Sequence, residues 1–465
     1  MAEVDSPEWW LRSIHRRLLD RRPNVELCRE YYDGQHRLAF ASRKFAETFG
    51  GLFGAFADNW CGLVVDASVE RLQVQGFRVG ENPEGDADAA RIWQRNNADS
   101  ESQLAFTESH VAGEAVATCW VGDDGLAEIT WEPADTALVV SDPKNRQRRL
   151  AGARFYLDEW GYEHAELFRP DAAYMWRSKT PRRGNTLTDS ARVHWVADDS
   201  IAGSRFDGEL SVMDNPFGVV PMVALTNNPR LWRTPEECAV GSEIQQIIPI
   251  QDAVNKLIAD LLVASEAGAA PLRWATGYTP EIDPESNEVK APPWTKDGAT
   301  WAVIQDATGK FGSLPAADLG NFVKAIDTLV QHVASISRTP PHYLNSSADR
   351  LSGESIKSAE TGLVAKVRGK QRSYADSLEE LIRLAGVVDG IDHLANATQC
   401  ETIWADPESR TESEHIDALN KKKDLGVPLQ QLWEEAPYSP EQIARFPAMQ
   451  AQVTLNDLIR LPDGN

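Results

Sequence analysis

The sequence predicts an α+β protein built from several subdomains, and three observations lead to that prediction. Apolar residues recur with helical period over long stretches between residues 242 and 385. Short segments of alternating apolar and polar residues crowd between residues 117 and 225, which is the pattern of strands. The chain has 465 residues, more than a single growing core usually holds, so we expect about two to four domains or subdomains.

The amino-terminal part is predicted to be mixed. Residues 6–31 predict a helix with an apolar face opposite a basic run, which we interpret as a solvated helix face. The run consists of Arg12, Arg16, Arg17, Arg21 and Arg22. A second apolar helix is expected between residues 45 and 67, then a strand at 74–79 and helices at 87–94 and 101–117. The segments from 117 to 225 follow one another through turn signals, so we expect an antiparallel β-rich region.

Three long helices are predicted next, over residues 242–270, 316–338 and 353–385. The first begins with Ser242 and Gln245 in capping-box spacing. The first two helices each carry one apolar stripe: Val254, Leu257 and Leu261 in the first, and Phe322, Ile326, Leu329 and Val333 in the second. A helix of this kind buries its stripe against a partner helix or a neighbouring subunit. At roughly 35 to 45 Å each, the two helices suggest a strut.

Two connections between these helices are unusual. Residues 271–315 form an insert rich in Pro, Gly and acidic residues, with short strand candidates at 272–275 and 300–304, and we interpret it as a docking tip. Residues 339–352 form a polar loop that is longer than the roughly 2 to 8 residues a simple helix connection needs. We therefore favour a functional loop over a disordered linker. A strand at 400–404 and a helical tail are expected after the third helix.

The charge balance limits the classes of function. The chain carries 47 basic and 70 acidic side chains, a net charge of −23, which argues against a broad basic face that grips DNA. The same charge suits a channel through which DNA slides without sticking. Five scattered cysteines predict reduced thiols, and no export signal or membrane span is expected.

No motif predicts catalysis. Gly309 and Lys310 lack the remainder of a phosphate-binding P-loop, and no G-x-S-x-G nucleophile elbow is present. The nine histidines are too widely spaced in the sequence to suggest a zinc site. We therefore expect no catalytic residue, no cofactor, no metal site and no enzymatic activity.

One basic run in the third predicted helix stands out in an acidic chain. It consists of Lys366, Arg368, Lys370 and Arg372. Contact with DNA, salt bridges between subunits and a plain solvated face all explain such a run, and the sequence leaves these alternatives open.

Three stretches resemble a known family by their order and context. They are residues 31–36 (Tyr-Tyr-Asp-Gly-Gln-His) together with 59–77, the helix at 241–262, and Pro340-Pro341-His342-Tyr343-Leu344 continuing through 352–360. Over nearly the whole chain the sequence resembles the portal proteins of tailed double-stranded DNA bacteriophages, the head-to-tail connector subunits of the long-tailed type.

The resemblance implies a portal fold with an α/β wing, a two-helix stem, a small α/β clip, a long wing helix and a helical crown. Carried onto this chain, it assigns residues 1–241 to the wing, 242–270 and 316–338 to the stem, 271–315 to the clip, 339–352 to a tunnel loop, 353–400 to the long wing helix and return strand, and 401–465 to the crown. The clip would point toward the packaging motor, and the loop toward the DNA. The loop residues implied to face DNA are His342, Tyr343, Asn345, Ser346, Ser347 and Arg350.

The function implied is a ring, dodecameric in the virion, at one capsid vertex. Double-stranded DNA would pass through it during packaging, retention and ejection. Implied partners are an ATP-hydrolysing terminase, the major capsid and scaffolding proteins and a head-completion adaptor, with assembly in the cytoplasm of the bacterial host and no membrane. Two alternatives remain, a minor capsid or adaptor protein without a DNA channel and a nucleic-acid enzyme with a new kind of site.

Overall fold

The computed structural model describes residues 3–36, 58–80, 85–182, 193–198, 205–207, 210–231, 241–269, 273–276, 282, 309–313, 318–344, 353–408, 412–436, 438, 442–443, 445–447 and 449. The chain divides into two compact units. The first comprises Met1–His36, Asn59–Ile248 and Ala334–Asn465, and the second Arg37–Asp58 and Pro249–Val333.

The first unit contains most of the secondary structure. Its helices are α1 (Pro7–Tyr32), α3 (Trp60–Val69), α4 (Ala87–Arg95), α5 (Ala98–Ala112), α8 (Pro341–Leu344), α9 (Gly353–Val388), α10 (Asp392–Ala395), α11 (Glu412–Asp424) and α12 (Leu429–Glu435). Its strands are β1 (Val74–Val79), β2 (Glu114–Val121), β3 (Ala127–Glu132), β4 (Ala137–Asp142), β5 (Asn145–Leu157), β6 (Glu163–Phe168), β7 (Ala172–Ser178), β8 (Trp195–Ala197), β9 (Arg205–Asp207), β10 (Leu210–Asp214), β11 (Met222–Thr226) and β14 (Cys400–Trp404).

These strands form three antiparallel sheets in the described part of the unit. The largest has the order β4-β5-β6-β7-β10-β9, with β8 paired to β7. A second sheet has the order β11-β2-β3, and β1 pairs with β14 across more than 300 residues of sequence. The prediction of an α+β protein with an antiparallel β-rich region is confirmed.

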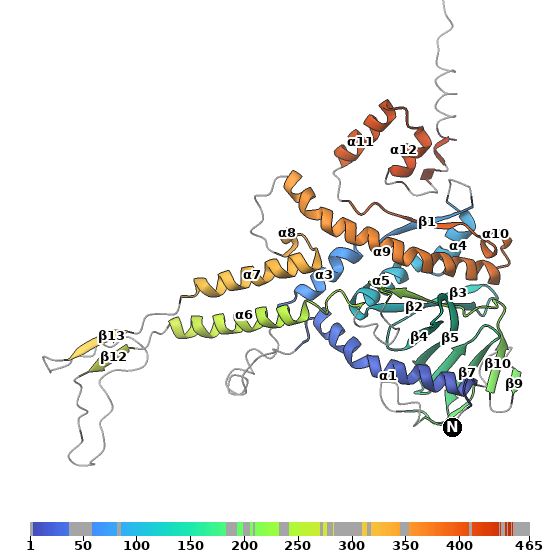
Figure 1. Ribbon diagram of the computed structural model, residues 1–465, viewed down its shortest axis with the longest axis horizontal. Coiled ribbons are helices and arrows are strands. Elements are labelled where there is room, and N and C mark those ends of the chain that lie inside the picture. Colours follow the sequence, from blue (N-terminus) through green and yellow to red (C-terminus); the bar gives the residue numbers. More distant parts are fainter. Residues whose placement is uncertain are drawn as a thin grey trace, which may run out of the picture. The chain divides into compact units, whose positions relative to one another are not determined.

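Helix α1 packs against the large sheet (Figure 1). The side chain of Ser6 caps it by accepting a hydrogen bond from the Trp9 amide at 3.2 Å. Pro7 occupies the first turn, where the missing N–H would lack a helical partner anyway. Ile14 and Leu18 are fully buried in a core shared with the sheet, and burying such a side chain stabilises the fold by roughly 1.5 to 3 kcal/mol.

The interpretation of the basic run of α1 as a solvated face is wrong for Arg21. This side chain is 2% exposed. Its Nη1 atom donates to Glu114 Oε1 at 3.2 Å, and Nη2 donates to the carbonyl oxygen of Ala137. Arg21 lies on the buried side because it is seven residues from Ile14, two helical turns along the same face.

Helix α9 begins at Gly353, as predicted, and continues three residues past the predicted end, to Val388. It is one continuous helix (Figure 1) that packs against β2, β11 and β14. The hydroxyls of Ser373 and Ser377 donate to carbonyl oxygens of β11, and the fully buried Tyr374 ring stacks on Phe106 at 5.2 Å. Polar side chains of this helix therefore bind it to β11, in addition to its apolar packing.

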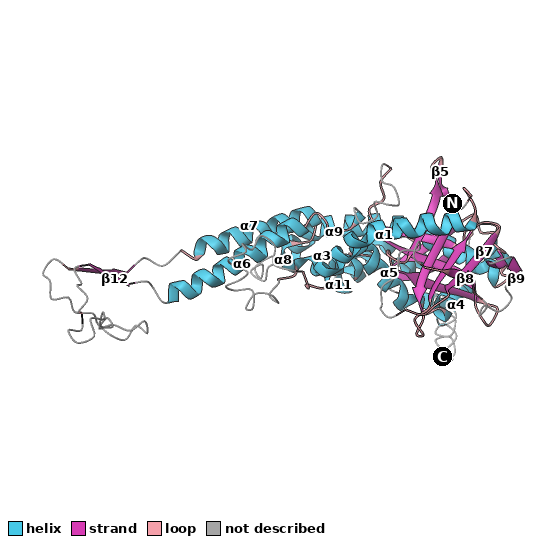
Figure 2. Ribbon diagram, turned by 90° about the horizontal axis from the view of Figure 1, so that it is seen from below, coloured by secondary structure: helices cyan, strands magenta, loops and turns pink. Residues whose placement is uncertain are grey.

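The second unit contains α6 (Ile248–Ala269) from Pro249 onward, most of α7 (Gly320–Ser337), β12 (Arg273–Thr276) and β13 (Lys310–Ser313). The two helices run side by side in opposite directions (Figures 1 and 2). Strands β12 and β13 pair antiparallel. The strand predicted at 300–304 lies outside the described residues.

The predicted start of the first long helix at residue 242 is wrong, because α6 begins at Ile248. The Glu243 amide donates to the His110 carbonyl at 2.9 Å, and the Ile244 amide donates to Ser242 Oγ at 3.2 Å. These contacts hold the backbone ahead of α6 outside the helix. Pro249 then falls in the first turn, where it is tolerated.

The structure describes four of the five cysteines of the chain. Cys28, Cys61 and Cys119 are buried free thiols, and Cys400 is a half-buried one. Cys238 lies outside the described residues. Among the helices that the structure describes, we find none with the length and apolar character needed to cross a bilayer.

Candidate functional site

The predicted tunnel loop begins with an ordered segment. Helix α7 ends at Ser337, Arg338 adopts a left-handed φ of 57°, and the Thr339 amide donates to the Ala334 carbonyl at 3.1 Å. The short helix α8 follows and contains His342 and Tyr343. The other predicted DNA-facing residues, Asn345, Ser346, Ser347 and Arg350, lie outside the described residues.

Arg71 binds this segment to α9. Its Nη2 atom donates to Tyr343 Oη at 2.8 Å and to Glu360 Oε1 at 3.1 Å. His342 Nε2 lies 3.8 Å from the same Glu360 oxygen. Hydrogen bonds to charged partners are roughly twice as strong as neutral ones, so α8 is firmly held. Sequence reasoning did not identify Arg71 or Glu360, although both lie in stretches that carry the portal resemblance.

A cavity of about 510 Å³ adjoins Tyr343. Its lining residues are Tyr32, Asn59, Gly62, Leu63, Asp66, Ala67, Glu70 and Tyr343. Burial, followed by the hydrogen bond to Asp66 at 2.9 Å, raises the pKa of Tyr32 to about 12. With two carboxyl side chains and a neutral phenol in its lining, the cavity does not suit a phosphate group.

The basic run of α9 divides into two inward and two outward residues. Lys366 and Lys370 lie one turn apart on the same face, with side chains only 10% and 5% exposed. Arg368 is half exposed and lies 2.8 Å from Glu408 and 3.5 Å from Asp406. Arg372 is exposed. Two of the four charges therefore face the interior of their own chain.

Glu243 is the counter-ion of both inward lysines. Its Oε1 atom accepts a hydrogen bond from Lys370, and Oε2 lies 3.6 Å from the Lys366 Nζ atom. Lys370 also donates to the side-chain oxygens of Asn227 and, at 2.6 Å, Asn228. Lys366 also donates to the Ser337 carbonyl at 3.0 Å. One carboxylate thus pairs with two lysines in a buried network, and its single negative charge neutralises only one of them.

The pKa values in this network follow from burial and charge. Burial alone would raise the pKa of Glu243, but Lys366 and Lys370 outweigh burial and hold that pKa well below its ordinary value. Burial lowers the pKa of Lys366, against the opposing effect of Glu243. Burial, with the charge of Lys370, lowers the pKa of the neighbouring His110 to about 3. His110 is therefore neutral at pH 7.

The predicted stem residues are buried to different degrees. Val254 and Val333 are fully buried, and the remaining five are half-buried: Leu257, Leu261, Phe322, Ile326 and Leu329. Leu262, Val323 and Ile336 on the same helices are exposed by 41%, 49% and 47%. These helices therefore present apolar side chains to solvent in the single chain.

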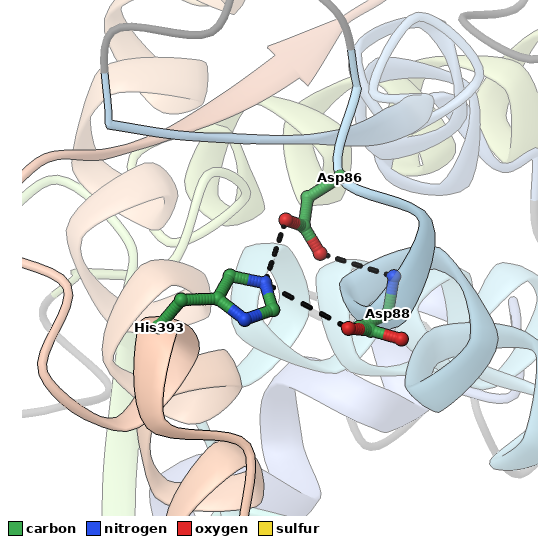
Figure 3. A group of neighbouring side chains, drawn as sticks. All are labelled: Asp86, Asp88 and His393. Atoms are coloured by element: carbon green, nitrogen blue, oxygen red, sulfur yellow. Dashed lines mark hydrogen bonds and ion pairs between the residues drawn. The ribbon is translucent and has the colours of Figure 1, made fainter.

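One group of side chains in the described residues has the composition of a metal site. The side chains are Asp86, Asp88 and His393 (Figure 3), with ligand atoms within 4.8 Å of one another. His393 Nε2 lies 2.9 Å from Asp86 and 3.8 Å from Asp88. The other oxygen of Asp86 caps α4 by accepting from the amides of Asp88 and Ala89, and Asp88 pairs with Arg91 at 2.8 Å. Helix capping and ion pairing explain all three residues, so we assign them no metal.

Comparisons with known proteins identify the family of this chain. A family model described as phage portal protein, SPP1 Gp6-like, matches residues 13–453. The chain is 28% identical over 375 residues to the portal protein of Mycobacterium phage D29 and 29% identical over 372 residues to that of Mycobacterium phage L5. Each alignment covers 77% of this chain and 71% of the relative.

Together with the α+β fold, these matches define a class of protein, the structural portal of a phage head. The chain belongs to the SPP1 Gp6-like family of phage portal proteins.

The predicted function is thereby confirmed. A portal protein is a head-to-tail connector that forms the ring-shaped DNA channel at one capsid vertex and serves genome packaging, retention and ejection. It is a structural virion component without enzymatic activity of its own, and it associates with capsid and terminase. The competing interpretation as an adaptor without a DNA channel is not favoured.

Proposed function

We propose that the described elements carry the portal's regions as follows. The pair α6 and α7 forms the stem, the insert at 271–315 with β12 and β13 forms the clip, and residues 339–352 form the tunnel loop. Residues 1–241 form the wing, residues 353–400 with α9 and β14 form the long wing helix and return strand, and residues 401–465 with α11 and α12 form the crown. The side-by-side course of α6 and α7 supports the stem assignment (Figure 2).

The tunnel loop contacts DNA through His342, Tyr343, Asn345, Ser346, Ser347 and Arg350. The supporting observation is the anchoring of residues 337–343 by Arg71, Glu360 and Lys366, because a loop whose base is fixed can present its tip at a defined place. The polar tip carries only one strongly basic side chain, Arg350. Contacts to phosphate would therefore be weak and transient, as sliding DNA requires.

The charge pattern of α9 supports the same picture. A channel wall that exposed all four basic residues of the run would bind DNA tightly. Glu243 neutralises one of the two inward lysines, and both are buried. Only Arg368 and Arg372 remain as candidates for DNA or inter-subunit contact.

The ring is dodecameric in the virion, with stem stripes packed around it. The exposed Leu262, Val323 and Ile336 support packing between neighbouring subunits. The clip docks the terminase, which supplies ATP hydrolysis, and later the head-completion adaptor, while the wing contacts capsid and scaffolding proteins. Assembly takes place in the cytoplasm of the bacterial host, which the free buried thiols of Cys28, Cys61 and Cys119 support.

Deletion of residues 345–349 tests the loop. We expect intact rings by negative-stain electron microscopy and impaired packaging or retention of DNA in assembled heads. Full genomes packaged and retained normally by the deletion variant would refute the proposed role of the loop.

A further inference from the structure

We propose that Lys366 is a positioning residue, which fixes the base of the tunnel loop to α9 with Glu243 as its buried counter-ion. The functional meaning of this inference rests on the proposed role of residues 339–352, whereas the anchoring itself does not. The sequence alone does not distinguish Lys366 from the other three basic residues of the run. In the structure Lys366 is buried and paired, whereas Arg372 is exposed.

The first contact is made at the carboxyl end of α7. Lys366 Nζ donates to the carbonyl oxygen of Ser337, the last residue of that helix, at 3.0 Å. The last four carbonyl groups of a helix have no partner within the helix, and their partial negative charge favours a cation. Lys366 therefore acts as a carboxyl-terminal cap supplied from another helix, at the residue where the chain turns toward the loop.

The second contact holds Lys366 in place. Glu243 Oε2 lies 3.6 Å from the Lys366 Nζ atom, and Glu243 itself is fixed on several sides. Its amide donates to the His110 carbonyl at 2.9 Å, and its Oε1 atom accepts from Lys370 and, at 3.0 Å, from Asn228. A carboxylate restrained in this way cannot follow a moving lysine, so it determines where the ammonium group lies.

Close packing beside Glu243 adds to this rigidity. The Gly241 carbonyl accepts from the Asn227 side chain at 2.7 Å. A Cβ atom at Gly241 would lie 2.8 Å from the Asn227 carbonyl oxygen and 3.2 Å from that of Gly113, so this position has no room for a side chain. The segment that leads toward α6 is thus pinned, and Lys366 joins it to the end of α7.

A second attachment lies on the same helix. Glu360 precedes Lys366 by six residues, about 9 Å along α9, and binds Arg71 at 3.1 Å beside His342. Lys366 holds Ser337, and the Glu360 cluster holds α8. Two attachments define both the position and the direction of the chain that enters the loop, whereas one attachment would leave a pivot.

Hydrogen exchange on the full-length protein tests the anchoring. In Lys366→Met we expect the amides of Thr339 and Tyr343 to exchange about tenfold faster, because their hydrogen bonds to Ala334 and Pro340 lose a fixed support. The amides of Phe155 and Ala165 in the large sheet should be unchanged. Arg372→Met is the matched control on the same helix and should leave all four amides unchanged.

Lys366→Arg keeps the positive charge and a donor for the Ser337 carbonyl, so protection at Thr339 and Tyr343 should return to within about twofold of wild type. This variant also keeps the test decisive if the Met variant does not fold. Unchanged exchange at both amides in Lys366→Met would overturn the proposal, and so would acceleration spread equally over the sheet. Loss of protection at these amides in Lys366→Arg would likewise overturn it.

Heads assembled with Lys366→Met should lose DNA retention although the loop sequence is intact. If deletion of residues 345–349 has no effect on DNA while Lys366→Met still loosens residues 339–343, the anchoring stands and the role of the loop in DNA contact fails. If Lys366→Met leaves these amides protected, the anchoring fails whatever the deletion does.

Discussion

Replacing Glu243 with Gln would leave Lys366 and Lys370 buried without a carboxylate. The three side chains are only 5% to 10% exposed, so solvent would screen the two ammonium groups poorly. Removing one partner of a buried ion pair usually costs about 3 to 5 kcal/mol, because a charge stays behind without compensation.

The contacts that remain in Glu243→Gln reduce the expected loss of unfolding free energy toward the lower end of this range. Asn227, Asn228 and the Ser337 carbonyl would still accept hydrogen bonds from the lysines in Glu243→Gln. These acceptors offset part of the loss, so we expect a decrease of about 3 kcal/mol in the free energy of unfolding of the first unit. Glu243→Gln combined with Lys370→Met should be less destabilised than the sum of the single variants, since the second change removes one of the uncompensated charges.

Denaturant unfolding followed by the fluorescence of the chain's tryptophans measures this difference, at one protein concentration because the subunits associate. Glu401→Gln is the matched control. Glu401 pairs with Arg78 at 3.0 Å but is 69% exposed, so its loss should cost at most about 1 kcal/mol. Equal effects of the two variants, or a loss below about 1 kcal/mol for Glu243→Gln, would refute the reasoning about the buried network.

The pKa of His110 is about 3 in the folded protein against an ordinary 6.5, so between these pH values the unfolded chain binds a proton that the folded chain does not. The free energy of unfolding should therefore fall as pH decreases from 6.5 toward 3, by up to about 1.4 kcal/mol per pH unit. Thermal melts of His110→Asn over this range should show a weaker dependence of stability on pH. In urea unfolding, Arg21→Met should lower the free energy of unfolding of the first unit by about 3 kcal/mol. Glu114→Gln should lower it by less, because Arg21 keeps the Ala137 carbonyl as a partner. The opposite order would contradict the role of Arg21 as a buried side chain bound to both groups. If Arg368 and Arg372 touch DNA, their joint replacement by Ala should reduce the slope of log binding constant against log salt for purified rings by about two, whereas an unchanged slope with weakened ring assembly would assign them to subunit contacts.

Local periodicity was sufficient to predict much of the fold. Apolar residues recur with helical period from Leu363 to Val388, so one long helix could be predicted there. The alternating segments likewise predicted β3 and β6. The start of α6 could not be predicted in this way, because Glu243 is held by His110, more than 100 residues away.

For the candidate site too, features set by the local sequence could be predicted, whereas features set by remote partners could not. A polar loop between two long helices is visible in the sequence, and so is a basic run in an acidic chain. The inward orientation of Lys366 and Lys370 is not visible, because it depends on Glu243 and Asn227 from remote segments. The burial of Arg21 could not be predicted for the same reason, since its partner Glu114 lies 93 residues away on β2.

We propose a ring whose tunnel loop faces the DNA channel. Electron cryomicroscopy of the assembled portal in DNA-filled heads tests it most directly. We expect a closed ring with a central hole and residues 345–349 at its narrowest point, next to DNA density. Monomers or asymmetric dimers in place of rings, or a ring with these residues on its outer rim, would contradict it.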